Sequence, residues 1–485
     1  MDSALDQVSA DGHWNLEAPH DECGVFGIWN HSDAAALTAL GLHALQHRGQ
    51  ASAGIVSHDA QRFYSHRGLG LVGENFENRA VMDTLKGHRA IGHNRYATTG
   101  GVVLRNVQPL YADFAFGGLA VGHNGNLTNA TLLRRALVGR GCLFQSTSDS
   151  EVFIHLIAMS RFGTVIDRLT DALRQVVGAY SLVALTENAL FGARDPLGVR
   201  PLILGRVGTD GWVLASETCA LEIVDAEFVR DIEPGEIVVI TDTGVQSIKP
   251  FGVQPSRFCV FEYIYFARPD SVAEGMPVYE ARKRIGEVLA RESHVAADVV
   301  VPVPDSGVPS AMGYAAESGI PFELGIIRNH YVGRTFIEPT DNIRHLGVKL
   351  KHSANKVVLA GKRVILVDDS IVRGTTSREI IDMARQAGAN SVTFTSAAPP
   401  VRYPHVYGIN MPSREELVAS GRKIPDIATE LGADYLIYQE VADMQAAILE
   451  GSEIERLEMS CFTGEYVTGT VTPEYLAWVE ANQLS

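Results

Sequence analysis

The segment 363-RVILVDDSIVRGTTS-377 combines residue types that suit a phosphorylated ligand. An apolar run, expected to form a buried strand, ends in Asp368 and Asp369, and a short loop containing Gly374 leads into a predicted helix. Ligands of open α/β sheets bind beyond the carboxyl ends of the strands, and the first turn of a helix offers unpaired N–H groups to an anion. We therefore expect a phosphate cradle here, with the two carboxylates placed to accept hydrogen bonds from sugar hydroxyls or to hold a divalent cation. The pattern is not a Walker loop, because no Gly-Lys-Ser/Thr follows it.

A second loop has the same arrangement. In 302-PVPDSGVPSAMG-313 a predicted strand again ends in a turn, with Asp305, Ser306 and Gly307 at its tip, and a helix follows. Further on, 328-RNHYVGRTFIEP-339 is polar and has no clear periodicity, which is typical of a surface loop. Taken separately, the second loop is also compatible with an ordinary strand–helix turn.

Together these strings resemble the phosphoribosyl pyrophosphate (PRPP) signature of type I phosphoribosyltransferases. The resemblance implies that Asp368 and Asp369 bind the ribose hydroxyls, that Asp305, Ser306 and Gly307 face the pyrophosphate, and that 328–339 forms a lid that excludes water. It also implies an Mg²⁺ ion held by Ser306, Asp368 and Asp369. The residues expected to hold the 5′-phosphate are Ser370, Ile371, Val372, Arg373, Gly374, Thr375 and Thr376, and the expected lid residues are Arg328, Tyr331, Gly333 and Arg334.

Cys23 begins the apolar string 22-ECGVFGIW-29 in the first part of the chain. A single cysteine before a strand is usually a small buried apolar residue. Four further strings change this interpretation, because they are Gly- or Ser-rich turns that supply Arg95, Asn124 and Asp149, the polar groups that a free amino acid would need. These strings are 43-HALQHRGQASAGI-55, 92-GHNRYATTG-100, 122-GHNGNLTN-129 and 146-STSDSEVF-153.

The combination resembles the N-terminal-nucleophile glutaminases, also called class II glutamine amidotransferases. The resemblance implies that Cys23 is the nucleophile and that Arg95 binds the α-carboxylate of glutamine through its planar guanidinium. It further implies that Asp149 holds the α-ammonium group, and that the Asn124 side chain and the Gly125 backbone N–H form the oxyanion hole.

The α-amine of Cys23 is the expected base for this chemistry. A thiol of pKa about 8.5 needs activation, and the sequence shows no clear His partner for it. An α-amine of pKa about 7.7–8.0 is neutral often enough at pH 7 to accept the thiol proton. Because an amide nitrogen is not basic, residues 1–22 are expected to be an inhibitory propeptide that is cleaved between Glu22 and Cys23.

The two resemblances in one chain point to a family that opens de novo purine synthesis. Its reaction converts glutamine, PRPP and water into 5-phosphoribosylamine, glutamate and pyrophosphate, with ammonia passing between the sites through an enclosed channel. The family also implies purine nucleotides as feedback inhibitors and a homodimer or homotetramer. Some members carry an iron–sulfur cluster on four cysteines; here Cys259 and Cys461 are retained, but His405 and Glu458 stand at the other positions, so we expect no cluster.

Two other functions remain open at this point. A relative with the same glutaminase half could aminate a sugar phosphate or an acidic amino acid, but the segment 364–377 argues against it because those enzymes lack a PRPP loop. A PRPP-sensing regulator would bind the ligand without converting it and would present a basic surface to nucleic acid. The formal net charge of −16 and the long glutaminase-like half argue against this regulator.

The elements that position these residues divide the chain into two unlike parts. Residues 23–250 alternate short apolar runs with Gly-rich turns and helical stretches at 33–45 and 149–162, which predicts an α+β N-terminal-nucleophile hydrolase fold, sheet on sheet with helices outside. After the Pro- and Gly-containing stretch 249–257, strands alternate with helices, which predicts an α/β fold with a mainly parallel sheet. The expected divisions are a propeptide 1–22, a glutaminase domain 23–250, a phosphoribosyltransferase domain 256–464 and a tail 465–485 without readable chemistry.

The length and composition of the chain exclude several classes of protein and favour one cellular location. With 485 residues, the chain has room for more than one full-sized core. The acidic balance argues against electrostatic binding to nucleic acid or anionic membranes, and no apolar run approaches the roughly 18–20 residues that span a bilayer. The first 22 residues match neither a secretory signal nor an Arg-rich transit peptide, and five scattered cysteines do not make a disulfide framework, so we expect a cytoplasmic protein.

Overall fold

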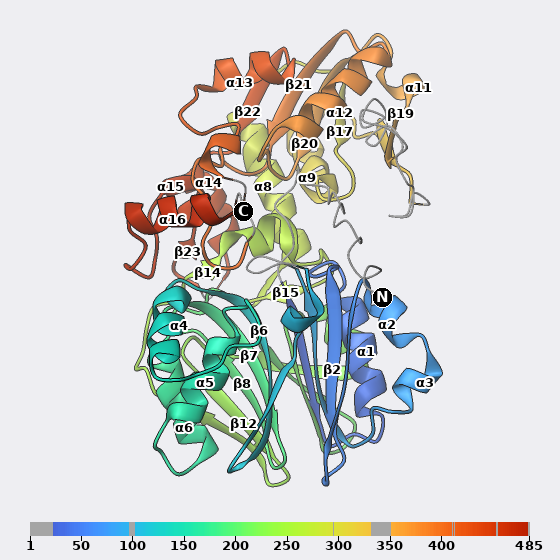
Figure 1. Ribbon diagram of the computed structural model, residues 1–485. Helices are drawn as coiled ribbons and strands as arrows, with labels where there is room; N and C mark the ends of the chain where they lie inside the picture. The colour runs from blue at the N-terminus through green and yellow to red at the C-terminus, as the bar shows by residue number, and fades with distance from the viewer. Residues whose placement is uncertain are drawn as a thin grey trace, which may run out of the picture.

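The computed structural model describes residues 23–96, 102–293, 295–330, 351–409, 411, 413–452 and 454–483. The chain forms two halves that lie one above the other in Figure 1, an N-terminal half (residues 23–250) and a C-terminal half (residues 256–483). The predicted propeptide and the predicted lid residues Tyr331, Gly333 and Arg334 lie outside the described residues.

Two antiparallel sheets face each other in the N-terminal half. Side chains from both sheets, among them Trp29, Ile91, Val183 and Leu214, fill the space between them and are almost completely buried. This arrangement confirms the predicted α+β fold with one sheet packed on the other. In order across each sheet, the seven-stranded sheet consists of β11 (Ala226–Asp231), β9 (Ile203–Val207), β10 (Gly211–Ala215), β1 (Gly24–Trp29), β4 (Arg89–Arg95), β2 (Ser52–His58) and β3 (Phe63–Leu69), and the six-stranded sheet consists of β13 (Gly244–Ile248), β12 (Ile237–Thr241), β8 (Leu190–Arg194), β7 (Gly178–Thr186), β6 (Gly117–Leu127) and β5 (Leu110–Phe114).

Strand β1, which follows Cys23, shows how the sequence builds a sheet with two apolar faces. Val25 belongs to the core between the sheets, whereas Phe26 belongs to the cluster beneath α1 (Ala34–Ala44), as the two-residue period of a strand requires. The helix lies close to the strand, since a Cβ at Gly41 would lie 2.3 Å from the Phe26 ring. The complete burial of Phe26 stabilises the fold by roughly 1.5–3 kcal/mol relative to an exposed position. This packing holds the strand that begins next to the predicted nucleophile.

Helices cover both outer faces of this pair of sheets (Figure 1). The predicted helices at 33–45 and 149–162 are confirmed as α1 and α5. The group that packs against the seven-stranded sheet is α1, α2 (Val72–Phe76), α3 (Arg79–Met82) and α7 (Cys219–Glu222), and the group that packs against the six-stranded sheet is α4 (Ala130–Gly139), α5 (Glu151–Met159) and α6 (Val165–Leu173).

A four-stranded parallel sheet forms the centre of the C-terminal half, which confirms the predicted α/β fold. Its central strand is apolar at successive positions because both faces are buried: Leu366 faces one core cluster, and Ile365 and Val367 face the other. In order across the sheet, the strands are β17 (Val299–Pro302), β20 (Arg363–Asp368), β21 (Ser391–Ser396) and β22 (Tyr435–Tyr438), and the helices of this half include α8 (Val278–Glu292), α9 (Val308–Ser318), α11 (Lys356–Leu359), α12 (Thr375–Gln386), α13 (Ile424–Leu431) and α14 (Val441–Leu449).

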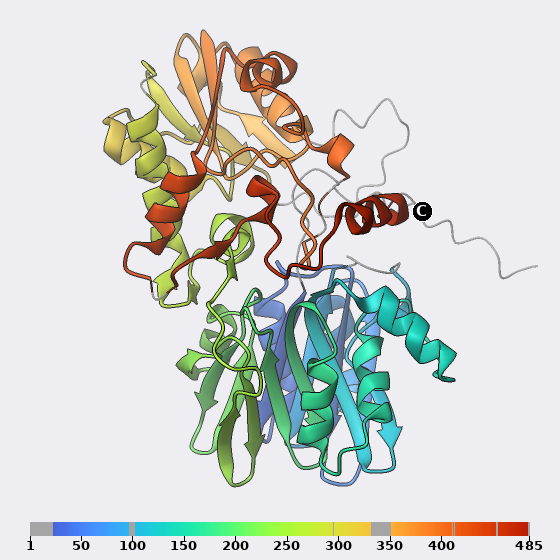
Figure 2. The ribbon, with the colours of Figure 1, turned by 90° about the vertical axis from the view of Figure 1, so that its left-hand side faces the viewer.

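The last part of the chain returns to the junction between the two halves. The final helix, α16 (Pro473–Gln483), lies above the N-terminal half, beside the junction (Figure 2). None of the helices in the described ranges has the length and apolar character needed to cross a membrane. The remaining small elements are the parallel pair β14 (Phe258–Cys259) and β23 (Leu457–Glu458), the antiparallel pairs β15 (Val272–Ala273) with β16 (Met276–Pro277) and β18 (Ile326–Arg328) with β19 (His352–Ala354), a π-helical turn Glu262–Phe266, and α15 (Ser460–Thr463).

Candidate functional sites

The residues predicted to bind and cleave glutamine gather around one small cavity. Gly24 of β1 lies opposite Asn94 of the antiparallel β4, so the two strands bring Cys23 to the end of β4 at Arg95. The cavity has a volume of about 10 Å³, about the space that one water molecule needs. Its walls are Cys23, Arg95, Tyr96, Gln108, His123, Gly125, Ser148, Asp149 and Ser150.

Burial raises the pKa of the Cys23 thiol. The positive charge of Arg95 acts in the opposite direction and Asp149 adds to the rise, but burial dominates. The Sγ atom lies 3.7 Å from the carbonyl oxygen of Tyr96, to which the S–H donates. The thiol is therefore protonated at neutral pH and must give its proton to a base before it can attack.

Asn124 and Gly125, the residues predicted to form the oxyanion hole, lie near the end of β6. Both polar atoms of the Asn124 side chain are buried and have no hydrogen-bond partner among the described residues. Leaving a buried amide unpaired costs about 1–3 kcal/mol, so this group is available to a ligand oxygen. Gly125 has a φ of 137°, and a Cβ there would lie 2.1 Å from the Ala179 carbonyl oxygen, so the position accepts only glycine. Gly125 is among the residues that line the cavity, and Asn124 is its neighbour in the strand.

Asp149 is held by the backbone next to these two residues. Its Oδ2 accepts a hydrogen bond from the Leu127 N–H at 3.0 Å, and the Ser148 and Ser150 hydroxyls lie 3.5 Å from its Oδ1. His123 Nδ1 lies 3.9 Å from the same carboxylate, but burial lowers the pKa of His123 and favours its neutral form. A carboxylate in this position can accept hydrogen bonds from an ammonium group.

Arg48 is a buried residue of this site for which the sequence indicated no role. Its Nε donates to the carbonyl oxygen of Cys23 at 3.2 Å, and its other nitrogens bind the carboxylates of Glu217 at 2.6 Å and Glu262 at 2.7 Å. Glu262 belongs to the C-terminal half, so this charged group joins the two halves next to the nucleophile. The signal that could have indicated it is a charged residue within the small-residue string 43–55.

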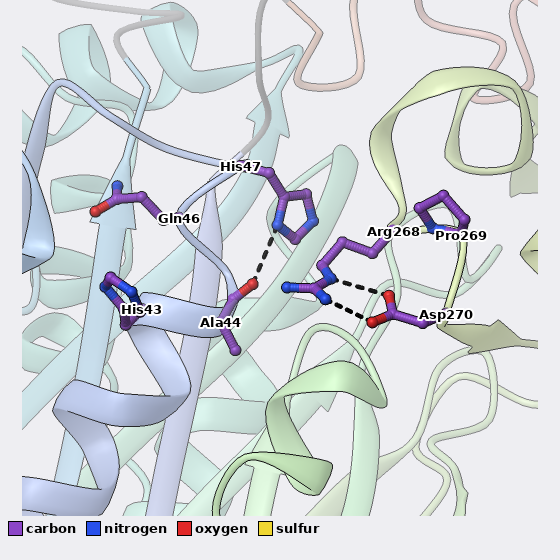
Figure 3. A pocket seen from close by; sticks show the side chains of 7 residues that line it. All are labelled: His43, Ala44, Gln46, His47, Arg268, Pro269 and Asp270. Atoms are coloured by element: carbon purple, nitrogen blue, oxygen red, sulfur yellow. Dashed lines mark hydrogen bonds and ion pairs between the residues drawn. The ribbon is translucent and has the colours of Figure 1, made fainter. Parts of the chain in front are cut away.

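A second cavity, of about 550 Å³, is open to solvent at the end of α1 (Figure 3). Arg268 and Asp270, which lie on its rim, form an ion pair with each other at 2.5 Å. The residues predicted to act on glutamine or PRPP do not line it. The residues predicted to act on glutamine therefore line the smaller of these two cavities and not the larger one.

The carboxylates of the predicted phosphate segment stand at the carboxyl end of β20. The Ser306 hydroxyl donates to Asp369 Oδ1 at 2.5 Å, and the Ser370 hydroxyl donates to Oδ2 at 2.8 Å. The second loop approaches closely at Gly307, where a Cβ would lie 2.4 Å from a carbonyl oxygen of β20. The structure thus brings together Ser306, Asp368 and Asp369, the residues predicted to hold Mg²⁺.

Burial raises the pKa of Asp368 well above its ordinary value, and the adjacent Asp369 raises it further. Such a buried pair of carboxylates is stabilised by a cation or by hydrogen-bond donors. Carboxylate and hydroxyl oxygens are hard ligands of the kind that Mg²⁺ prefers, so this group of atoms fits the predicted ion.

The loop after these acids leads to the N-terminus of α12. Gly374 has a φ of 82°, and a Cβ there would lie 2.8 Å from the Leu431 side chain. This N-cap glycine has no side chain that could accept a hydrogen bond from the first turn, and the N-terminus of a helix is a favourable position for an anion. The side chains of Ile371 and Val372 are buried in the core and, being hydrocarbon, leave these two predicted ligands only their backbone groups for a phosphate.

Arg328, the described member of the predicted lid residues, binds Asp305 in the second loop. The Nη1–Oδ2 distance is 2.5 Å, and both side chains are about half exposed. Exposed ion pairs contribute about 0–1 kcal/mol, so this contact opens easily when a ligand competes for either group.

Cys259, His405 and Glu458 come together in the C-terminal half, with potential ligand atoms within 4.8 Å of one another. His405 Nδ1 accepts backbone N–H groups from Tyr407 at 3.2 Å and Ile409 at 3.4 Å, so the ring proton is on Nε2, which donates to Glu458 Oε2 at 3.0 Å. This leaves the ring without a lone pair for a metal. Burial raises the pKa of Cys259 to about 12, which disfavours the thiolate that an iron–sulfur cluster requires. These residues therefore do not fit such a cluster.

Comparison with known families assigns a domain to each half. Residues 93–222 match the family described as glutamine amidotransferase domain, and residues 279–408 match the family described as phosphoribosyl transferase domain. The amidophosphoribosyltransferase of Rhizobium etli is 54% identical over 457 residues, covering 93% of this chain and 91% of its own. The amidophosphoribosyltransferase of Bacillus subtilis is 48% identical, covering 93% of this chain and 95% of its own.

Solved structures match both halves together. The glutamine PRPP amidotransferase of B. subtilis, solved in complex with ADP and GMP, has a TM-score of 0.88 and 46% identity, and the match covers 93% of this chain and 98% of that one. A structure described as the allosteric regulatory enzyme of purine biosynthesis also has a TM-score of 0.88 and 46% identity, covering 94% of this chain and 99% of that one.

Proposed function

The chain belongs to the amidophosphoribosyltransferase family, and on that premise we propose which of its residues carry out each part of the reaction. The protein transfers the amide nitrogen of glutamine to PRPP and yields 5-phosphoribosylamine, glutamate and pyrophosphate, in the first step of de novo purine synthesis. The observation that carries the assignment is the gathering of Cys23, Arg95, Gly125 and Asp149 around one cavity.

Cys23 is the nucleophile for glutamine. Its Sγ attacks the side-chain carbonyl carbon, the C–N bond breaks as the departing nitrogen takes up a proton, and water hydrolyses the resulting thioester to glutamate. The α-amine of Cys23, available once residues 1–22 are removed, accepts the thiol proton and passes it to the departing nitrogen. Arg95 binds the α-carboxylate of the substrate, and Asp149 binds its α-ammonium group.

Asn124 and Gly125 stabilise the oxyanion that forms during this attack. The buried, unpartnered amide of Asn124 and the position of Gly125 on the cavity wall support this role. Donors that are already held in a dry site need no reorganisation when charge develops on the oxygen, and this makes such groups effective in catalysis.

PRPP binds at the carboxyl end of β20. Residues 370–376 and the first turn of α12 hold the 5′-phosphate, and Asp368 and Asp369 hold the ribose hydroxyls. The loop 305–307 lies next to the pyrophosphate. Arg328 leaves Asp305 and binds the substrate when PRPP enters the site. Ser306, Asp368 and Asp369 would hold Mg²⁺, which when bound offsets the charge of the departing pyrophosphate.

Ammonia released at Cys23 passes through the junction of the halves to C1 of the ribose. The buried contact of Arg48 with Glu262 and the partly buried contact of Asn126 with the Val406 carbonyl oxygen support a closed junction. An enclosed path keeps ammonia from being lost to solvent before it reacts.

We extend the proposal to the regulation of the protein, its oligomeric state and its location in the cell. A relative was solved with ADP and GMP, so we propose that purine nucleotides inhibit this chain as well. We also propose a homodimer or homotetramer, and a cytoplasmic location, where the free state of the five cysteines is maintained.

The Cys23→Ser variant tests the proposal. Glutamine-dependent formation of 5-phosphoribosylamine should be lost, whereas formation from ammonia and PRPP should persist, because the second site is intact. N-terminal sequencing of the active protein should find Cys23 first. Retention of glutamine-dependent activity in the variant, or full activity in protein that still begins at Met1, would show that the assignment is wrong.

A further inference from the structure

The C-terminal segment 465–483 runs along the junction between the halves and ends in α16, above the N-terminal half (Figure 2). The Tyr466 hydroxyl donates to the Pro404 carbonyl oxygen at 2.7 Å, which fastens the segment to the C-terminal half. The Thr470 hydroxyl then lies 3.3 Å from the hydroxyl of Thr128, directly after β6 in the N-terminal half. The segment is thus a bridge between the halves.

Asn126, at the end of β6, is the residue through which this bridge reaches the site. Its Nδ2 donates to the Val406 carbonyl oxygen at 2.8 Å, and its side chain is also hydrogen-bonded to the Tyr475 hydroxyl on α16. Burial raises the pKa of Tyr475 to about 12, and the charge of Asp149 adds to this rise. The Val406 carbonyl oxygen and the Tyr475 hydroxyl, both in the C-terminal half, therefore hold the Asn126 side chain of the N-terminal half.

Asn126 stands between two backbone groups that the glutamine reaction uses. The residue before it is Gly125, and the residue after it is Leu127, whose N–H donates to Asp149 Oδ2 at 3.0 Å. The C-terminal half also packs directly on this backbone, since a Cβ at Gly408 would lie 3.1 Å from the Gly125 Cα. A displacement of Asn126 therefore moves both neighbours, and a misplacement of about 1 Å in a catalytic group costs about 10²-fold in rate.

We propose that Asn126 is a positioning residue for glutamine hydrolysis, held in place by the Val406 carbonyl oxygen and the Tyr475 hydroxyl. It sets the Gly125 N–H for the oxyanion and, through Leu127, the Asp149 carboxylate for the α-ammonium group. The inference rests on the proposed roles of Gly125 and Asp149. It makes the C-terminal helix a part of the glutamine site.

Two variants test this inference by the kinetics of glutamine and of ammonia. Tyr475→Phe removes one hydrogen bond and keeps the ring, so kcat/KM for glutamine should fall about three- to tenfold. Asn126→Ala removes both bonds, and kcat/KM should fall about ten- to hundredfold, with a lower kcat and a higher KM. The synthesis of 5-phosphoribosylamine from ammonia and PRPP should be unchanged in both variants, which a general loss of folding would not allow.

Tyr466→Phe is the matched control, because its hydroxyl binds Pro404 within the C-terminal half. It should leave glutamine kinetics unchanged. An equal loss in Tyr466→Phe and Tyr475→Phe would overturn the inference, since it would show general packing of the segment. Wild-type glutamine kinetics in Tyr475→Phe would also overturn it. The proposed function fails separately, if Cys23→Ser keeps glutamine-dependent activity.

Discussion

Arg48 donates a hydrogen bond from Nε to the carbonyl oxygen of Cys23, at 3.2 Å. The same guanidinium binds Glu217 of the N-terminal half and Glu262 of the C-terminal half. Burial lowers the pKa of Arg48, but the two carboxylates outweigh this effect and raise it, so the group is always charged. The backbone of the nucleophile is therefore anchored to a charged cluster that both halves build.

Replacement of Arg48 by methionine should destabilise the protein strongly. Removing one partner of a buried charged cluster leaves unpaired carboxylates, which costs about 3–5 kcal/mol in the free energy of unfolding. Urea unfolding measures the loss. Arg79→Met, at an ion pair whose arginine side chain is 93% exposed, is the control and should change stability by less than about 1 kcal/mol. Equal stability of the two variants would contradict the buried cluster.

Asn124→Ala should lower the kcat of glutamine hydrolysis by about 10²–10³-fold, because one oxyanion donor is lost. The KM for glutamine should change little, since the amide acts mainly on the transition state. Steady-state release of glutamate measures both constants, and ammonia-dependent synthesis in the same preparation is the internal control. An unchanged kcat would remove Asn124 from the oxyanion hole.

His93 should make the protein less stable as the pH falls. Burial lowers the pKa of His93 from 6.5 to about 3, so between these values the unfolded chain binds a proton that the native protein does not. Stability is therefore lost on acidification, by about 2 kcal/mol from pH 7 to pH 5 for this group. Urea unfolding at the two pH values should show a smaller difference in His93→Gln than in the wild type.

The exposed His88 provides the control for this measurement. His88→Gln is measured in parallel, so that the effect of replacing an exposed histidine can be compared with that of replacing the buried His93. A His93→Gln protein with the full wild-type difference between pH 7 and pH 5 would show that this histidine is protonated in the native state.

Removal of divalent cations should separate the two half-reactions. EDTA should abolish the formation of 5-phosphoribosylamine, from glutamine or from ammonia, because the group Ser306, Asp368 and Asp369 then lacks its ion. The PRPP-independent hydrolysis of glutamine at Cys23 should persist. Added Mg²⁺ should restore synthesis, and synthesis at full rate in EDTA would contradict the assignment.

The absence of an iron–sulfur cluster stays a prediction that an iron and sulfide assay decides. Purified protein should contain far less than one iron per chain, because the His405 ring nitrogens are engaged by backbone N–H groups and Glu458. A content of about four irons per chain would overturn this expectation.

The sequence by itself predicted the two fold classes and the overall reaction, and it supplied the candidate residues of the two sites. Cys23, Arg95 and Asp149 lie in short sequence motifs whose residue types indicate their chemistry without a structure. The spacing of apolar residues changes near residue 250, and this change separates an antiparallel from a parallel sheet. These signals are local, because strand and helix periods and turn residues act over a few positions.

The tertiary structure alone decided how the halves are joined and how the side chains are held. Arg48 and Glu262 are 214 residues apart, and Asn126 and Val406 are 280 apart, so no local period marks either pair. The burial of the Ile371 and Val372 side chains in the core depends likewise on packing. Such contacts follow from the way whole elements pack together, and a single polar residue in a string does not reveal its distant partner.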